Sequence, residues 1–316
     1  MKRALLTTLL GLLVVALVGS AAMAAPLRFG LSVPSLSMTW FVFLKNAVEE
    51  QAAEMGVDLV VLDARNEVGK QMSDVEDMIV QGLDGVLLVP INVEALVPAV
   101  EALNEAGIPV VTVDRKIVGA PYLCHVGADN VEGGRMAGEF IAHLLGGEGK
   151  VIELTGTPGS SPAIDRGTGF NEVIAQYPKI EIIAQQTGQF TRAEGMSVME
   201  NLIQAYPEFD AVFAHNDDMA MGALEAIKGS GIDLDDVIVV GFDAIEDALV
   251  AVARGELEAT IEQQPKQQAK TAFKILVDYV RDGIEPPAQD IYLTPLLIMK
   301  GTLERAESWD TVKDQL

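Results

Sequence analysis

The sequence predicts an α/β protein of two lobes, each built around a central parallel sheet with Rossmann-like alternation of strands and helices. Three observations predict this fold. Short runs of Val, Ile and Leu alternate with amphipathic stretches, the runs fall into two similar series, and each run is apolar throughout. Continuous apolar runs of this kind are typical of parallel strands that are covered by helices on both faces of the sheet.

The two series of apolar runs have similar spacing. They begin near Leu27, Asp58, Gly85 and Pro109, and again near Lys150, Glu181, Ala211 and Val237. The intervals are roughly 24 to 31 residues, the size of one strand–helix step. A chain of 316 residues also exceeds what one such core usually holds, so each series is expected to form its own lobe.

Helix start and stop signals follow several of these runs. Thr191 and Glu194 have the spacing of a capping box, and Gly56 is expected to end a helix that begins near Trp40. Asn92 is expected to open another helix. The alternation of strands and helices is therefore supported by local signals as well as by hydrophobicity.

The first 24 residues are predicted to be a cleaved secretory signal peptide. Lys2 and Arg3 give a positive start, residues 4–18 are apolar apart from two threonines and one glycine, and Ala22–Ala24 offers small residues for cleavage near Ala24. The alternative is a membrane anchor, but the run is shorter than the roughly 20 residues that a spanning helix needs. The mature protein is expected to be periplasmic.

Composition narrows the partners. Without Lys2 and Arg3 the chain has 20 basic and 46 acidic residues, a net charge of −26. The electric field of a protein with this negative charge repels nucleic acid and leaves a neutral solute unaffected. The single cysteine, Cys124, lies in an apolar stretch far from the cleavage site, which indicates a buried, inert thiol and no lipid anchor on cysteine.

Polar residues gather where the predicted strands end, the edge at which open parallel sheets bind ligands. The positions are Asp63, Asn92, Asp114-Arg115, Thr155, Asn216 to Asp218 and Asp243. Helix capping explains Asn92 and Asp217 well. An acid and a planar base at one strand end, as in Asp114-Arg115, instead make a neutral, hydrogen-bonding pair that suits a binding site.

Seven spaced motifs carry a resemblance to a known family. They are Trp40–Lys45, Val111–Arg115, Gly127–Asn130, Asp165–Phe170, His215–Ala220, Val240–Asp243 and Thr260–Gln263. Over essentially the whole mature chain these residues resemble the ribose-binding-protein-like group of type I periplasmic binding proteins. The resemblance implies two lobes joined by a three-stranded hinge. The implied lobes are 26–128 plus 264–292 and 129–263 plus 293–316, with crossings near Ala128, Gln263 and Asp290.

The resemblance also implies a function. Such a protein is a periplasmic solute-binding protein of an ABC importer and is not an enzyme. It binds a monosaccharide, whether pentose, hexose or furanose, or a sugar alcohol, as its lobes close about the hinge. The implied partners are the ligand and the importer's permease subunits, and we expect a monomer with no cofactor and no metal. The alternative is a periplasmic sugar sensor that presents its ligand to a chemoreceptor or a histidine kinase.

Nine site residues are carried over from the resemblance. Stacking rings are implied at Trp40, Phe41 and Phe190, and hydroxyl-binding groups at Asp114, Arg115, Arg166, Asn216, Asp243 and Gln263. A sugar has apolar C–H faces that suit flat rings and edge hydroxyls that suit paired donors and acceptors. The alternative without a binding role is that the three aromatics belong to the hydrophobic core, where most aromatic residues lie.

One position departs from the ribose-binding pattern. Met38 stands where that pattern has an asparagine, and a thioether cannot make an amide's hydrogen bonds. We therefore regard Met38 as a specificity position, for which Ser35 or Ser37 could compensate. The strings Gly159–Arg166 and Gly188–Arg192 look closer to relatives that bind galactofuranose or polyols.

Arg166 is expected to open a helix that runs to Tyr177. A cation is unfavourable at a helix start because of the macrodipole, so its placement favours a role in the cleft. Enzyme motifs are lacking: no Gly-x-Gly-x-x-Gly follows a strand, and Gly149-Lys150 is followed by Val151 rather than Ser or Thr. The histidines are far apart, and no calcium-loop pattern is present.

Overall fold

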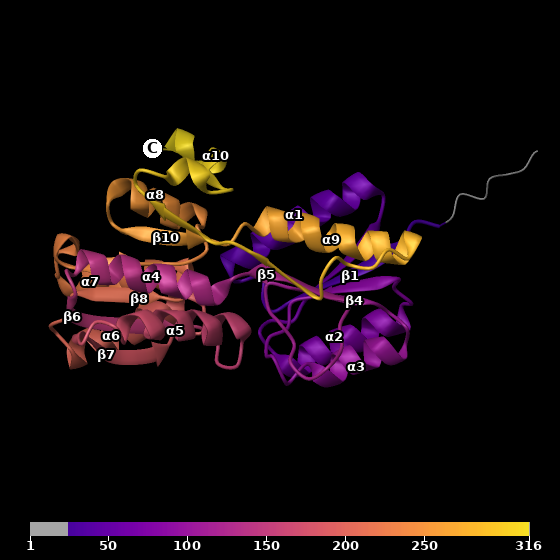
Figure 1. The fold of residues 1–316 in the computed structure, drawn as a ribbon, viewed down its shortest axis with the longest axis horizontal. Coiled ribbons are helices and arrows are strands. Elements are labelled where there is room, and N and C mark those ends of the chain that lie inside the picture. The colour runs from indigo at the N-terminus through magenta and orange to yellow at the C-terminus, as the bar shows by residue number, and fades with distance from the viewer. Residues whose placement is uncertain (1–24, 316) are drawn as a thin grey trace, which may run out of the picture.

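A computed structural model describes residues 25–315. The predicted signal peptide lies outside this part of the chain. Two α/β lobes lie side by side, joined by thin connections (Figure 1). None of the helices among the described residues is long and apolar enough to cross a membrane.

The first lobe is built on a six-stranded sheet. Its strands are β1 (Arg28–Val33), β2 (Asp58–Asp63), β3 (Gly85–Leu88), β4 (Val110–Val113), β5 (Cys124–Ala128) and β11 (Asp290–Leu293). They lie in the order β11-β5-β4-β3-β1-β2 and all pair in parallel. Helices α1 (Thr39–Met55) and α9 (Pro265–Asp282) cover one face, and α2 (Val68–Val80) and α3 (Val97–Glu105) cover the other (Figure 1).

The second lobe repeats this plan. Its strands are β6 (Glu148–Thr155), β7 (Lys179–Thr187), β8 (Ala211–Ala214), β9 (Ile238–Val240), β10 (Ala259–Glu262) and β12 (Leu296–Met299). Their order is β12-β10-β9-β8-β6-β7, with only the edge strand β12 antiparallel to its neighbour. Helices α4 (Asn130–Leu144) and α5 (Ser161–Ile174) cover one face, while α6 (Arg192–Ala205), α7 (Asp217–Ser230) and α8 (Glu246–Arg254) cover the other.

Short helices complete this lobe. They are α10 (Trp309–Val312) and the 3₁₀ turns Leu234–Asp236, Leu303–Arg305 and Lys313–Gln315. The predicted fold class, two parallel-sheet lobes, is confirmed. The predicted strands are found within three residues of their expected starts, because continuous apolar runs bury both faces of each central strand. Cys124 is fully buried as expected, and burial raises the pKa of its thiol to about 11.

The chain passes between the sheets three times. The first passage follows Ala128, and the second lies between Glu262 in β10 and the start of α9. The third lies between Leu293 and Leu296, a few residues beyond the crossing expected near Asp290. Asp290 and Leu293 both pair with β5 in the first sheet. Leu293 therefore belongs to the first lobe, and the expected second-lobe segment 293–316 begins one residue too early.

Several expected helix ends need correction. Helix α5 begins at Ser161 and not at Arg166, because Pro162 occupies its first turn, where proline is well tolerated. Arg166 therefore lies beyond the first turn, and the macrodipole reason for placing it in the cleft is wrong. Helix α3 begins at Val97, while the Asn92 side chain accepts the N–H groups of a preceding turn.

Two other expected helix ends are confirmed, and a third needs correction. Gly56 ends α1 in the left-handed conformation, as expected. Thr191 caps α6 by accepting the N–H of Glu194. Asn216, and not Asp217, caps α7: its side chain accepts the N–H of Met219.

Candidate functional site

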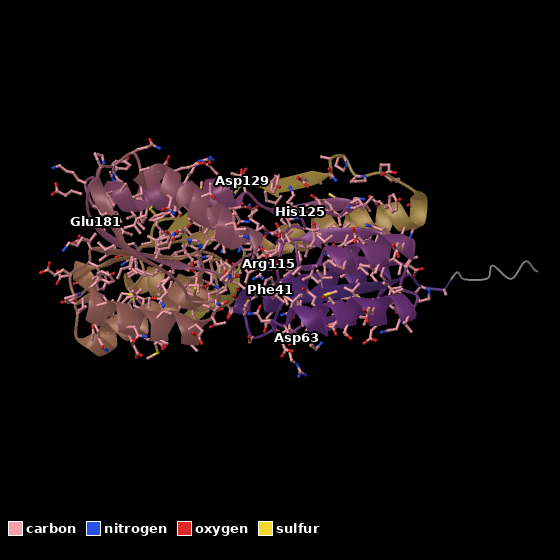
Figure 2. The ribbon with its side chains drawn as sticks, turned by 90° about the horizontal axis from the view of Figure 1, so that it is seen from below. Phe41, Asp63, Arg115, His125, Asp129 and Glu181 are labelled. Atoms are coloured by element: carbon pink, nitrogen blue, oxygen red, sulfur yellow. The ribbon has the colours of Figure 1, made fainter. Side chains whose placement is uncertain are left out.

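A cavity of about 280 Å³ lies between the lobes, at the carboxyl ends of both parallel sheets. Phe41 and Arg115 mark its position in the middle of the molecule (Figure 2). It is lined by Met38, Trp40, Phe41, Asp114, Arg115, Pro162, Arg166, Phe190, Asn216, Asp243 and Gln263. Its lining combines apolar and aromatic side chains with a few polar and charged groups, as is typical of small-molecule sites.

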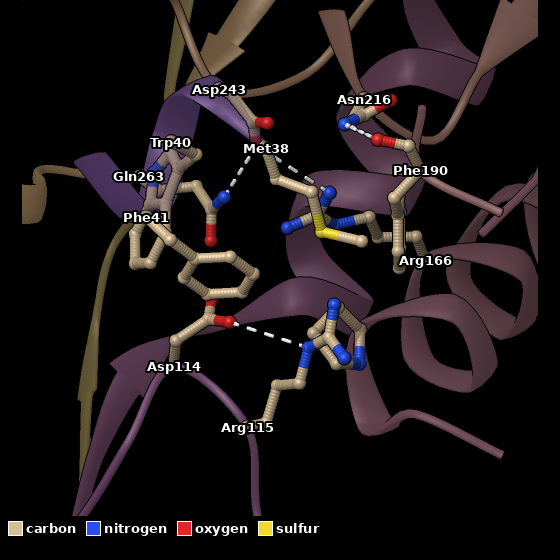
Figure 3. Close-up of a pocket in the computed structure, with 11 residues that line it drawn as sticks. Met38, Trp40, Phe41, Asp114, Arg115, Arg166, Phe190, Asn216, Asp243 and Gln263 are labelled. Carbon is tan, nitrogen blue, oxygen red and sulfur yellow. Dashed lines mark hydrogen bonds and ion pairs between the residues drawn. The ribbon is translucent and has the colours of Figure 1, made fainter. Parts of the chain in front are cut away.

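Three aromatic rings reach this cavity from both lobes (Figure 3). Trp40 and Phe41 lie in the first turn of α1, with ring centroids 5.4 Å apart and planes at 86°. Phe190 comes from the loop before α6 with a φ of 61°, a conformation rare for a bulky residue. Its ring fits because Gly156 has no Cβ, which would collide with it.

Two acid–base pairs form the polar part of the wall. Asp114 Oδ2 lies 3.8 Å from Arg115 Nε, and Asp243 Oδ1 lies 3.6 Å from Arg166 Nη1. All four side chains are at most 5% exposed. When both pairs are ionised, the cavity wall carries two formal charges of each sign, and this balance favours a neutral guest.

Burial shifts these groups toward their neutral forms. It raises the pKa of Asp114 to about 6 and that of Asp243 well above its usual range, while the nearby arginines act in the opposite direction. Burial also lowers the pKa of Arg115 to about 10 and lowers that of Arg166. Clusters of such shifted groups in a cavity are typical of functional sites.

Each arginine is held by further contacts. Arg166 donates from Nε to Asn130 Oδ1 at 2.8 Å, donates from Nη1 to the carbonyl of His215, and lies 3.7 Å from the centre of the Phe242 ring. Arg115 lies 5.2 Å from the centre of the Phe41 ring. Both guanidinium groups are therefore fixed before any ligand binds, which lowers the ordering cost of binding.

Unusual backbone conformations place both aspartates. Asp114 has a φ of 60° directly after β4, and Asp243 has a φ of 119° three residues after β9. Non-glycine residues at positive φ cost free energy, and such residues concentrate at ligand sites. The two carboxylates are thus turned into the cavity at the expense of local backbone strain.

Three buried polar atoms at the cavity have no hydrogen-bond partner. They are Trp40 Nε1, Arg115 Nε and Gln263 Oε1. The other end of the Gln263 amide donates to Asp243 Oδ1 at 2.5 Å. A buried polar atom without a partner costs about 1–3 kcal/mol, and a ligand with hydroxyl groups would remove this cost.

All nine predicted site residues, together with Met38, line this one cavity. The three aromatics both line the cavity and belong to the buried core, since each is less than 5% exposed. Asn216 has a second task, because its amide nitrogen donates to the Phe190 carbonyl. Sequence reasoning missed Pro162, although a proline after Ser161 is itself a helix-start signal. Asp63 does not line the cavity; its carboxylate accepts N–H groups of Leu36 and Arg65.

The two lobes also touch at the rims of the cavity. On one side Val93 N–H donates to the Gly159 carbonyl at 3.0 Å, and Lys116 N–H donates to Ser161 Oγ at 2.9 Å. On another, Thr39 donates to Asp218. The two lobes are therefore held together by hydrogen bonds at more than one rim of the cavity.

The comparison with known proteins identifies the family. The family model described as "Periplasmic binding protein domain" matches residues 29–284. The chain belongs to this family. This confirms the resemblance drawn from the seven motifs.

Relatives of known name agree with this assignment. The chain is 45% identical to the ribose import binding protein of Bacillus subtilis, over 79% of this chain and 80% of that one. A Caulobacter myo-inositol binding protein, solved with myo-inositol, has a TM-score of 0.87 at 37% identity, covering 90% of this chain and 97% of that one. A galactofuranose binding protein has a TM-score of 0.86 at 32% identity, with coverage of 92% and 99%.

Proposed function

We propose that this protein is a periplasmic solute-binding protein of an ABC importer, whose lobes close around one monosaccharide or sugar alcohol. The observation that carries the proposal is the cavity wall. It combines three aromatic rings with two balanced acid–base pairs, and it leaves Trp40 Nε1, Arg115 Nε and Gln263 Oε1 without hydrogen-bond partners. Rings suit the C–H faces of a sugar, and open polar atoms suit its hydroxyls.

The charge balance supports a neutral ligand. Arg115 and Arg166 each have a carboxylate within 4 Å, so neither offers an unpaired cation to a phosphate or a carboxylate. The ligands that name the three relatives above, ribose, myo-inositol and galactofuranose, are all neutral, compact and polyhydroxylated. They support the ligand class and do not select one member of it.

The remaining parts of the proposal concern location and partners. Secretion would depend on the predicted signal peptide, and the closed lobes would present a surface to permease subunits in the inner membrane. We infer a monomer, because one ligand site is complete within a single chain. Solute binding needs no chemical step, cofactor or metal, and the proposed roles of the cavity residues are all those of binding.

A thermal-shift screen tests the proposal. The mature protein would be heated with pentoses, hexoses, furanoses, inositols and linear sugar alcohols, with a sugar phosphate as the charged control. A ligand at 100 times its Kd stabilises the native state by about 2.7 kcal/mol, so at least one neutral compound should raise the unfolding midpoint by several degrees. A midpoint raised by the sugar phosphate alone would contradict the neutral-ligand proposal.

A further inference from the structure

Helix α1 presents Trp40 and Phe41 to the cavity but has no cap of its own. Its N-cap residue, Met38, makes no side-chain hydrogen bond, and its first turn holds no acidic residue. The first N–H groups of a helix have no partner within the helix and need acceptors from elsewhere. The segment that carries the aromatic pair therefore depends on an acceptor from another part of the molecule.

That acceptor comes from the second lobe. Asp218 Oδ2 accepts the backbone N–H of Thr39 at 3.1 Å, and Asp218 Oδ1 accepts the Thr39 hydroxyl at 3.2 Å. The Asp218 side chain is 9% exposed, and the two residues are 179 positions apart in the chain. Asp218 also lies in the first turn of α7, so its carboxylate sits at two helix N-termini, each of which favours negative charge.

We propose that Asp218 is a positioning residue that caps α1 across the cleft when the lobes are closed. The inference rests on the proposed function of the cavity and assigns to Asp218 a part in ligand affinity without ligand contact, since it does not line the cavity. By holding Thr39, it fixes the turn that places Met38, Trp40 and Phe41.

The contact is specific to the closed form because its two halves belong to different lobes. An interaction made in only one of two states stabilises that state by its whole free energy, and ligand affinity follows the population of the binding-competent state. At the other rim, the contacts of Val93 with Gly159 and of Lys116 with Ser161 use backbone donors and no charged side chain. Asp218 thus makes a charge-assisted contact at one rim of the cavity, whereas the contacts of Val93 and Lys116 at the other rim are between neutral groups.

The surroundings of Asp218 offer a matched control. Arg192 Nη2 lies 3.7 Å from Asp218 and 2.8 Å from Asp247. The Asp247 side chain is 60% exposed. Its hydrogen bond is to Arg192, and it makes none to α1. Asp247→Asn therefore removes the same charge beside the same arginine without touching the cap.

The test compares Asp218→Ala, Thr39→Val and their double variant with Asp247→Asn, using titration calorimetry with the best ligand from the thermal-shift screen. Loss of an N-cap acceptor typically weakens a helix by about 1–2 kcal/mol, so Asp218→Ala should weaken affinity about 5- to 30-fold. Thr39→Val keeps the N–H donor and should cost about two- to fivefold. Asp247→Asn should stay within about twofold of the wild type.

A coupling measurement separates positioning from a general structural role. The double variant should bind no more weakly than Asp218→Ala alone, because the Thr39 hydroxyl loses its partner in either case. Wild-type affinity in Asp218→Ala, or losses that simply add in the double variant, would overturn the inference while leaving the proposed function intact. A wild-type protein that binds no sugar or polyol would overturn both together.

Discussion

Two buried aspartates of the second lobe, Asp217 and Asp243, are similar in burial and different in what surrounds them. Asp217 is fully buried, and its carboxylate accepts hydrogen bonds from the Thr260 hydroxyl at 2.8 Å and from the Ile245 N–H at 3.0 Å. Asp243 lines the cavity, and its Oδ1 lies 3.6 Å from Arg166 Nη1. The same oxygen accepts a hydrogen bond from the Gln263 amide nitrogen, while the Gln263 amide oxygen has no hydrogen-bond partner. Burial raises the pKa of both.

The difference shows what marks the site. A shifted pKa is common to both aspartates and so does not distinguish a structural carboxyl from one that meets a ligand. Hydrogen-bonding atoms that remain open at a cavity do distinguish them. The group around Asp217 ties α7 to the start of α8 and to β10, whereas the group around Asp243 faces a space that a ligand can fill.

The largest expected effect tests the cavity side of this comparison. Arg166→Ala leaves Asp243 buried without its cation, and truncating one partner of a buried charge pair costs about 2–5 kcal/mol in binding. Affinity should fall about 30-fold or more by titration calorimetry. Asp114→Asn should also weaken binding strongly, and asparagine tolerates the φ of 60° at that position.

The control for both variants is Asp217→Asn, because the Asp217 side chain is buried nearby and does not line the cavity. Its affinity should stay within about threefold of the wild type. Urea unfolding of each variant would show whether the fold is kept. Arg166→Ala and Asp114→Asn proteins that fold and bind with wild-type affinity would remove both residues from the site.

A smaller effect tests the structural side. Because burial raises the folded-state pKa of Asp217 to about 8 from an ordinary value of 3.8, the folded state holds this proton more tightly than the unfolded state. This acid therefore lowers the free energy of unfolding as the pH rises from about 4 to 8. Asp217→Asn has no proton to lose, so its stability should fall less between pH 5 and pH 8.

Urea unfolding midpoints at pH 5, 6, 7 and 8 measure this difference. Asp243, Asp114 and Glu262 also have raised pKa values, so both proteins should keep some loss of stability over the range. We expect the unfolding midpoint of the wild type to fall more steeply with pH than that of Asp217→Asn. Parallel pH profiles for the two proteins would contradict it.

Much of the site could be predicted from sequence because strand ends are strong signals. Continuous apolar runs locate Asp114 and Asp243 after buried strands, and parallel strands bring their carboxyl ends to one edge. Phe190 was found through the family resemblance and not from its surroundings. Its position depends on a positive φ and on the missing Cβ of Gly156, which no local pattern reveals.

The errors have physical causes. The starts of α3 and α5 were misplaced because prolines in their first turns set the boundaries, while Asn92 only closes a turn. The cross-lobe cap of α1 by Asp218 was not predicted, since it joins residues that come together only when two separately folded lobes meet. Contacts of this kind depend on lobe docking and leave no periodic signal in the chain.

The most direct measurement is a crystal structure with the ligand that raises the unfolding midpoint most. We expect that ligand in the cavity, with its ring or chain against Trp40, Phe41 and Phe190. Its hydroxyls should lie within about 3.2 Å of Trp40 Nε1, Arg115 Nε and Gln263 Oε1. A ligand bound outside this cavity, or one that leaves all three atoms without partners, would contradict the proposed function.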